Sequence, residues 1–308
     1  MLNIIEGKIS RALKIVIYGS EGIGKSTLAS HFPDPLFIDT EGGTAHMDVR
    51  RIQKPGSWSE LLSDVQEVAK ADAICKTLVI DTADWAEQLC IAHVCAQYKL
   101  KSIESAGYGK GYTYLGEEFS RLLSSLDDVI ASGKHVVVTA HAKMRKFEQP
   151  DEEGAYDRWE MKLSRQVAPL IKEWADMLLF MNYKTYVVTS ENNTAKVHGG
   201  KRVIYTSHHP CWDAKNRQGL PEEMDASFDN LAHLFASEPK RITPMDTVHE
   251  LMDQDGITEP EICEVAYQRK KAPEKYAALS DLDPALITDW CIKYWPQIVE
   301  AVKQNRVY

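Results

Sequence analysis

The sequence predicts an α/β fold with a mainly parallel sheet, followed by a small α-helical domain. Over roughly the first 210 residues, short apolar runs alternate with segments of helical periodicity, which is the pattern of a sheet covered by helices. A glycine-rich phosphate-binding motif separates the first apolar run from the first helical segment. Residues 238–308 carry no strand pattern, and prolines divide them into short helical stretches. We therefore expect a core domain over 1–237 and a helical domain over 238–308.

Five strands are expected in the core, because five short runs combine apolar and β-branched residues. These runs span residues 13–18, 35–39, 77–81, 135–140 and 176–182. The segment 115–130 repeats apolar residues at helical spacing and predicts a crossover helix between the third and fourth strands. Residues 183–190 and 201–206 predict a β-hairpin appended to the sheet.

A P-loop motif follows the first expected strand. Residues 19–26 read GSEGIGKS and fit the pattern G-x-x-x-x-G-K-[ST], and residues 27–32 open a helix behind it. The glycines let the backbone bend around phosphates, because no Cβ blocks a positive φ. A nucleoside triphosphate is therefore the expected ligand. The residues expected to bind it are Gly19, Ser20, Glu21, Gly22, Ile23, Gly24, Lys25, Ser26 and Thr27, with Asp81 beside them.

Three of these residues have distinct expected roles. Lys25 is expected to contact the β- and γ-phosphates, and the hydroxyl of Ser26 is expected to hold magnesium. The third expected strand ends in Asp81, which is the form of the acidic strand in P-loop proteins. We expect Asp81 to complete the metal site with Ser26, directly or through water.

Further polar residues follow the second and fourth expected strands. The carboxyl ends of the strands form the ligand crevice in an open α/β sheet, and Asp39 and Glu41 are spaced to lie on the same side of one such end. Glu41 could activate the attacking water, or it could be a solvated acid that caps the turn at Gly42-Gly43. His141 could sense the γ-phosphate, or it could be a buried histidine bonded to the backbone.

The composition is that of a globular protein, with 44% hydrophobic and 26% charged residues. There is no run of 18 apolar residues, and the first residues lack the features of a secretory signal, so we expect a cytoplasmic protein without a membrane segment. A net charge of -9 confines any contact with nucleic acid to local patches. The six scattered cysteines favour reduced core thiols over a disulfide framework or structural zinc.

Several longer motifs resemble those of a known family. FIDTE at 37–41 is similar to the strand that bears the catalytic glutamate in RecA-type recombinases, and VVVTAHA at 136–142 is similar to the strand that ends in their polar sensor residue. With DTADWAEQLC at 81–90, YGKGY at 108–112 and HHPCWDAKNRQGLPEE at 208–223, the chain resembles phage-encoded AAA-type nucleotide-binding proteins, which are RecA-like single-strand annealing ATPases. The resemblance covers roughly residues 10–235.

This resemblance implies a RecA-like core that uses ATP and Mg²⁺, binds single-stranded DNA and promotes annealing or recombination in phage replication. It implies that Glu41, Lys25 and His141 act in catalysis and that protomers assemble into a homo-oligomer with ATP at their interfaces. RecA-type enzymes usually carry glutamine at the sensor position, where this chain has His141. A phage single-strand-binding protein is a further expected partner, and the host cytoplasm is the expected location.

Two segments have the composition of DNA-binding loops, because they combine cations for phosphates with rings for bases. We expect 99–114 to be a flexible loop, and 143–165 corresponds in position to the mobile DNA-binding loop of RecA-like cores. The second segment has six basic and six acidic residues, so an ordinary solvated loop is its alternative. The candidate DNA-binding residues are Lys110, Tyr112, Lys143, Arg145, Lys146, Phe147, Arg158 and Trp159.

The segment 196–217 is basic, with five Lys or Arg residues and one Asp. RecA-like ATPases commonly complete the γ-phosphate site of one protomer with a cation from its neighbour. Arg217 is the expected catalytic cation of this kind, and Arg202 and Lys215 are further candidates. Direct contact with DNA and simple solvation are the alternatives for this segment.

Taken together, the residues and the resemblance favour a DNA-stimulated ATPase that binds single-stranded DNA. One alternative is an annealing module in which ATP is a conformational ligand with little hydrolysis. The other is a P-loop small-molecule kinase, which is disfavoured because no arginine-rich lid segment lies near the nucleotide-binding strands.

Overall fold

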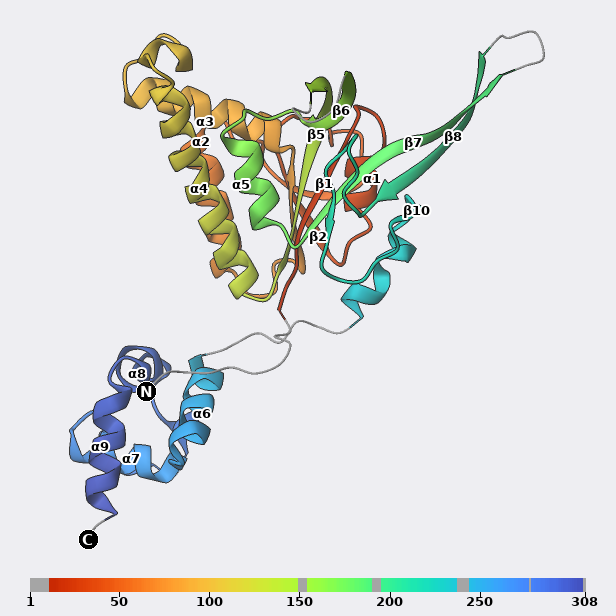
Figure 1. The fold of residues 1–308 in the computed structure, drawn as a ribbon. Coiled ribbons are helices and arrows are strands. Elements are labelled where there is room, and N and C mark those ends of the chain that lie inside the picture. The colour runs from red at the N-terminus through yellow and green to blue at the C-terminus, as the bar shows by residue number, and fades with distance from the viewer. Residues whose placement is uncertain (1–10, 149–153, 190–194, 237–243, 277, 307–308) are drawn as a thin grey trace. The chain divides into compact units, whose positions relative to one another are not determined.

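The computed structural model describes residues 11–148, 154–189, 195–236, 244–276 and 278–306 (Figure 1). The chain divides into two compact units, Met1–Lys240 and Arg241–Tyr308. The first unit is built on a mostly parallel sheet with helices, and the second is helical. The predicted fold class is thereby confirmed.

The first unit contains a ten-stranded sheet. Its strands are β1 Lys14–Gly19, β2 Pro35–Asp39, β3 Arg50–Ile52, β4 Thr77–Asp81, β5 His135–Glu148, β6 Ala155–Met161, β7 Met177–Thr189, β8 Ala195–Tyr205, β9 Lys215–Asn216 and β10 Glu223–Asp225. The main path runs β10-β8-β7-β1-β5-β4-β2-β3, while β6 pairs with β5 and β9 with β7. All neighbouring strands from β7 to β3 along this path are parallel. Strand β8 pairs antiparallel with both β7 and β10. The strand that precedes the P-loop therefore lies between β5 and β7.

Helices cover both faces of this sheet. They are α1 Lys25–Ala29, α2 Trp58–Lys70, α3 Ala83–Gln97, α4 Lys110–Ala131 and α5 Val167–Trp174, and α2 to α5 lie together on one face (Figure 1). Alternate residues of β1 enter two different cores, since Val16 packs in the cluster formed with α2 to α5 and Ile17 packs in the cluster formed with α1. Burial on both faces explains why the parallel strands read as continuous apolar runs in the sequence.

The predicted crossover helix is α4, but it begins before the expected apolar stripe. Residues 99–114 were expected to form a flexible loop, whereas a short 3-10 helix at Ile103–Ala106 is followed by the first turn of α4 at Lys110. A Cβ at Gly111 would lie 2.0 Å from the carbonyl oxygen of Ile103. Glycine at this position therefore lets the first turn of the helix pack against Ile103, and the loop prediction is wrong from Lys110 onward.

The second expected DNA-binding loop is also more ordered than predicted. Strand β5 continues to Glu148 and pairs antiparallel with β6, so much of 143–165 forms a β-hairpin rather than a loop. Lys143 stands opposite Glu160 in this pairing. Opposite charges across a strand pair stabilise it, and pairing satisfies the backbone groups that a loop would expose. Backbone pairing therefore accounts for the hairpin, in which Lys143 and Lys146 face acids and Arg145 faces Arg158.

The predicted hairpin beside the sheet is formed by β7 and β8. The expected strands 176–182 and 183–190 are one continuous strand, β7, and residues 190–194 lie outside the described residues. The register shifts between Lys184 and Thr185, opposite Gly200, whose φ is 134°. Gly200 thus accommodates a bulge inside β8. Strand β3 was missed because it has three residues and carries little apolar signal.

The second unit contains α6 Pro244–Asp255, α7 Glu259–Gln268, α8 Pro284–Leu286 and α9 Trp295–Asn305. Prolines stand at the first or second position of α7, α8 and α9, where a missing N–H costs no helical hydrogen bond. Val248, Ile262, Cys291 and Ile298 are among the fully buried residues of its own core. Among the described residues, no helix combines the length and apolarity needed to cross a bilayer.

Candidate nucleotide-binding and catalytic site

The P-loop connects β1 to α1 with glycines in conformations that other residues rarely adopt. Gly22 has a φ of 72° and Gly24 a φ of 103°. The side chain of Lys25 is buried, and its Nζ donates to the carbonyl oxygens of Gly19 at 3.2 Å and Ser20 at 3.0 Å. The backbone of the P-loop therefore accepts hydrogen bonds from the side chain of its own lysine.

The environment of Lys25 favours an anionic ligand. Burial lowers the pKa of this lysine, and the nearby carboxylates of Asp81, Asp84 and Glu41 oppose that effect. A phosphate chain beside the ammonium would compensate its desolvation further. The predicted phosphate role of Lys25 is thus compatible with its position.

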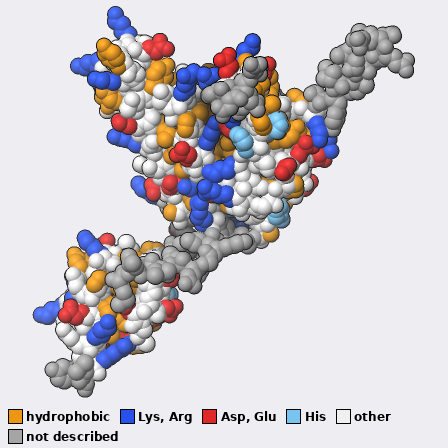
Figure 2. Space-filling view, viewed as in Figure 1, with side chains coloured by type: hydrophobic (Ala, Val, Ile, Leu, Met, Phe, Trp, Pro, Cys, Tyr) orange, Lys and Arg blue, Asp and Glu red, His pale blue; other side chains and the backbone are white. Residues whose placement is uncertain are grey.

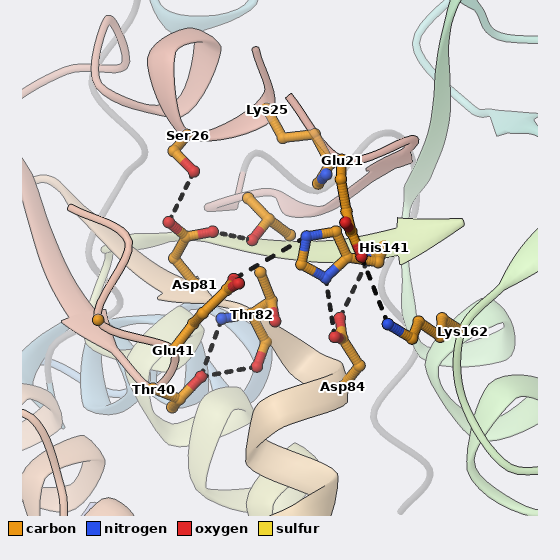
Figure 3. A network of polar contacts seen from close by, with 12 residues as sticks. Glu21, Lys25, Ser26, Thr40, Glu41, Asp81, Thr82, Asp84, His141 and Lys162 are labelled. Carbon is orange, nitrogen blue, oxygen red and sulfur yellow. Dashed lines mark hydrogen bonds and ion pairs between the residues drawn. The ribbon is translucent and has the colours of Figure 1, made fainter. Parts of the chain in front are cut away.

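Ser26 and Asp81 are brought together as predicted for a metal site. The hydroxyl of Ser26 donates to Oδ2 of Asp81 at 2.7 Å, and the hydroxyl of Thr139 on β5 donates to Oδ1 (Figure 3). Asp81 is 3% exposed. Hydroxyl and carboxylate oxygens are hard ligands that suit Mg²⁺, which usually keeps several waters and bridges to phosphates. The donor set therefore fits the expected metal.

Asp39 organises the loop that carries Glu41. Its carboxylate accepts from the N–H of Gly42 at 2.6 Å and from the N–H and hydroxyl of Thr44 at 2.8 and 2.6 Å. Burial opposes ionisation of Asp39, but these hydrogen bonds outweigh it and hold its pKa below the usual value. The acid that accepts hydrogen bonds from the turn at Gly42-Gly43 is therefore Asp39 and not Glu41. The side chain of Glu41 lies instead near the carboxyl ends of the strands.

Thr40 joins the ends of β2 and β4. Its N–H donates to the carbonyl oxygen of Asp81 at 2.8 Å, and its hydroxyl donates to the carbonyl oxygen of Thr82 at 2.8 Å. The N–H of Thr82 donates back to the same hydroxyl at 2.9 Å. This reciprocal pair fixes Glu41, the next residue, beside the metal-site acid.

His141 is held between two carboxylates (Figure 3). Its Nδ1 lies 2.8 Å from Oδ2 of Asp84, its backbone N–H donates to Oδ1 of Asp84 at 3.0 Å, and its Nε2 lies 3.9 Å from Oε2 of Glu41. Burial opposes ionisation of Asp84, but the bonds from His141 outweigh it and lower the pKa of Asp84. The ring of His141 therefore bonds to carboxylates rather than to the backbone, which was the alternative reading.

The segment after β6 joins this site to the P-loop. The N–H of Lys162 donates to the carbonyl oxygen of His141 at 2.7 Å, and its Nζ lies 3.4 Å from Oε1 of Glu21. Two residues later, the N–H of Ser164 donates to the buried carboxylate of Glu87 on α3. The residues that sequence reasoning missed at this site are Asp84, Thr40, Glu87 and Lys162.

The three cations proposed for a neighbouring site lie in different places. Arg217 lies 3.6 Å from Asp176, which precedes the amino end of β7, whereas the P-loop follows the carboxyl end of the neighbouring parallel strand β1. Nζ of Lys215 donates to the carbonyl oxygens of Lys172 and Glu173, at the C-terminal end of α5, so it acts as a helix cap. Arg202 lies beside the P-loop of its own chain.

The predicted DNA-binding residues are partly brought together. Tyr112, Lys143 and Arg145 line a cavity of about 600 Å³ between α4, α5 and the β5–β6 hairpin. Arg165, the last residue of the predicted segment 143–165, and Lys172, which lies outside both predicted segments, line the same cavity. Lys and Arg side chains gather around α5 on the face shown in Figure 2. We call the cavity lined by Tyr112, Lys143, Arg145, Arg165 and Lys172 the α5 groove.

The other predicted DNA-binding residues lie outside this cavity. Arg158 pairs with Asp213 and stacks over Phe147 at 5.3 Å, and the ring of Trp159 lies 6.1 Å from that of Phe180. These three side chains thus take part in packing within the core unit. Lys110 is exposed on the first turn of α4, and Lys146 is exposed on the hairpin. Strand alternation places Lys146 on the opposite face from Lys143 and Arg145.

Comparison with known proteins places this geometry in context. A family model described as "AAA domain" matches residues 11–218. The SPbeta prophage-derived uncharacterized protein YorG of Bacillus subtilis (strain 168) is 24% identical over 273 residues, which cover 87% of this chain and 73% of that protein.

Solved structures resemble the chain more distantly. The KaiC-like protein PH0186 of Pyrococcus horikoshii OT3 has 14% identity and a TM-score of 0.37, covering 69% of this chain and 83% of that one. The flagellar accessory protein FlaH of Methanocaldococcus jannaschii has 12% identity and a TM-score of 0.31, covering 65% and 79%.

Proposed function

The chain belongs to the AAA domain family, and on this premise we propose that it is an ATP-dependent protein that binds single-stranded DNA. In this proposal it promotes strand annealing or homologous recombination in phage DNA metabolism. The family and the P-loop together identify the chain as a P-loop ATPase. A phage origin is supported by the similarity to a prophage-derived protein.

One observation carries the catalytic part of the proposal: Glu41 and His141 meet beside the P-loop. They come from the carboxyl ends of β2 and β5, and 3.9 Å separates Oε2 of Glu41 from Nε2 of His141. Magnesium held by Ser26 and Asp81 would offset the charge on the phosphates. Glu41 is 36% exposed and can accept the proton of an attacking water, while His141 can contact the γ-phosphate.

The α5 groove supports the DNA-binding part of the proposal. Lys143, Arg145, Arg165 and Lys172 line it together with Tyr112. Arg145 lies 3.8 Å from Glu160, and Lys172 pairs with Asp213. Cations that follow the phosphates and a ring that stacks on bases are the means by which proteins bind single strands without sequence preference. The segment 162–166 connects this groove to His141 and Glu21, so bound DNA and bound nucleotide would contact the same segment.

A homo-oligomer is part of the same proposal, with Arg217 as the candidate cation for a neighbouring protomer. Its partner Asp176 precedes the amino end of β7, whereas the P-loop follows the carboxyl end of β1, to which β7 is parallel. Arg217 can therefore reach a γ-phosphate only in a neighbouring protomer.

An annealing assay tests the proposal. The rate at which two complementary DNA strands pair is measured with ATP and Mg²⁺, with ADP and Mg²⁺, and without nucleotide, for the wild type and for Glu41→Gln. We expect ATP to accelerate annealing in the wild type, and equal rates in all three conditions would contradict the proposal. ATP-dependent annealing at full rate in Glu41→Gln would instead favour ATP as a conformational ligand with little hydrolysis.

A further inference from the structure

A second cavity adjoins the P-loop on the side away from Glu41 and His141. Its volume is about 310 Å³, and it lies between α1, β7, β8 and residues 226–229. In the sheet, β5, β4 and β2 lie on one side of β1, and β7 and β8 lie on the other. A ligand that occupies this cavity and also reaches Glu41 must therefore extend across the P-loop.

Arg202 stands at the mouth of this cavity without a partner of its own. A Cβ built on Gly24 would lie 3.2 Å from Nη1 of Arg202, so the guanidinium lies against the P-loop backbone. Within the part of the chain that the structure describes, its guanidinium makes no hydrogen bond or ion pair. The adjacent Lys201, in contrast, is paired with Asp225 at 2.6 Å.

The backbone around Arg202 is held in place. Arg202 pairs with Tyr183 of β7, and its carbonyl oxygen accepts from the N–H of Ala226 at 3.1 Å. A cation on a paired strand, next to a phosphate-binding loop and free of an acidic partner, is suited to bind an anionic group of a ligand. The phosphate chain cradled by the P-loop is the anion within its reach.

The walls of the cavity suit the other end of such a ligand. Leu28, Met181 and Phe228 supply apolar surface, and Thr27 and Asp229 supply polar atoms. A volume of about 310 Å³ lies at the lower end of the range for small-molecule sites, which is large enough for a nucleoside when its phosphates lie outside. The ring of Phe228 is fixed by Phe32, with ring centroids 5.0 Å apart.

We propose that this cavity holds the base and ribose of the nucleoside triphosphate and that Arg202 binds the phosphate chain of the same protomer. This inference rests on the proposed ATPase function and deepens it. It also gives Arg202 a role different from the one expected from the sequence, because it completes its own site rather than that of a neighbour. The sheet topology then sets the orientation of the bound ligand, with its base beside β8 and its γ-phosphate beside Glu41.

Binding measurements on the full-length protein with Mg²⁺ test this arrangement. Dissociation constants for ADP are measured for the wild type, Arg202→Ala, Arg202→Lys and Lys201→Ala, with thermal unfolding as a check of folding. We expect Arg202→Ala to weaken ADP binding about tenfold or more, Arg202→Lys to restore part of the loss, and Lys201→Ala to change little. An unchanged constant for a folded Arg202→Ala would overturn the role of Arg202.

A cavity-filling variant tests the base site separately. His31 is exposed in the turn after α1 and lines the cavity, so His31→Trp should obstruct it without disturbing the core. We expect this variant to lose ADP affinity about tenfold while its affinity for inorganic tripolyphosphate stays unchanged. Equal ADP binding by folded His31→Trp and wild type would overturn the base site. Failure of the wild type to bind any nucleotide would instead reject the ATPase proposal itself.

Discussion

The carboxylate of Asp84 accepts hydrogen bonds from both the ring and the backbone N–H of His141, at 2.8 and 3.0 Å. This double contact fixes the ring so that its other nitrogen faces Glu41. Asp84 is the first-turn acid of α3, and His141 is the last residue of the buried part of β5. A helix and a strand thus jointly orient the ring of His141.

Asp84 should act as a positioning residue for His141. We expect Asp84→Asn to lower kcat for ATP hydrolysis about tenfold with little change in KM, because an amide holds the ring less firmly than a carboxylate while the P-loop is untouched. Steady-state kinetics measure both constants. The same substitution is also made in His141→Ala. If Asp84→Asn lowers kcat by the same factor in the wild type and in His141→Ala, Asp84 acts independently of His141.

The hydroxyl of Thr40 should stabilise the junction of β2 and β4. Thr40→Val removes the acceptor of the Thr82 N–H and the donor to the Thr82 carbonyl, so we expect a loss of about 1–3 kcal/mol in the free energy of unfolding. Urea denaturation measures this free energy. Thr40→Ser keeps the hydroxyl and serves as the matched control. If both variants lose the same stability, the hydrogen bonds are not the cause.

Charges in the α5 groove should set the salt dependence of DNA binding. We expect Arg145→Ala to weaken binding of a single-stranded oligonucleotide and to reduce the slope of log K against log salt concentration by ~0.7, the value for one phosphate contact on a single strand. Fluorescence anisotropy at several salt concentrations measures the slope. Lys303→Ala, which removes an exposed cation from α9 in the second unit, should leave the slope unchanged. An unaltered slope in Arg145→Ala would exclude this side chain from the DNA path.

Buried His135 should make the stability of the protein depend on pH. Its Nδ1 accepts from the N–H of Leu13 at 3.0 Å, and burial lowers its pKa from 6.5 to about 4. The unfolded chain therefore takes up a proton as the pH falls below 6.5, while the folded chain stays neutral at this site until about 4. This group should reduce the free energy of unfolding by up to about 3 kcal/mol across that window.

Denaturation at several pH values checks this dependence. We expect His135→Gln, which can still accept from Leu13, to lose that part of the decrease in stability between pH 6.5 and 4. The full decrease in the variant would show that other groups produce it.

The sequence predicted those parts of the fold that depend on local pattern. Strands β2 and β4 begin and end where their apolar runs do, because helices bury both faces of each strand. The β5–β6 hairpin was missed because it depends on pairing between two strands rich in charged residues, such as Lys143 opposite Glu160, and no apolar run marks it. Charge alternation of this kind resembles a solvated loop when the partner strand is unknown.

The candidate site was predictable only in part for the same reason. Lys25, Ser26 and Asp81 belong to motifs with fixed spacing, and the structure brings them together. The role of Asp84 depends on a contact with His141 across 57 residues, and no local pattern reports such a contact. Of the further groove residues, Arg165 ends the predicted segment 143–165, whereas Lys172 belongs to a helix whose sequence gives no sign of a shared cavity.

Phosphate release from ATP, measured with and without added single-stranded DNA, tests the central claim most directly. The wild type and Lys25→Ala are compared, since Lys25 is the buried cation of the P-loop. The proposed function predicts hydrolysis by the wild type that increases on addition of DNA, and no DNA-dependent hydrolysis by Lys25→Ala. Hydrolysis that is independent of DNA in the wild type, or that persists undiminished in Lys25→Ala, would contradict it.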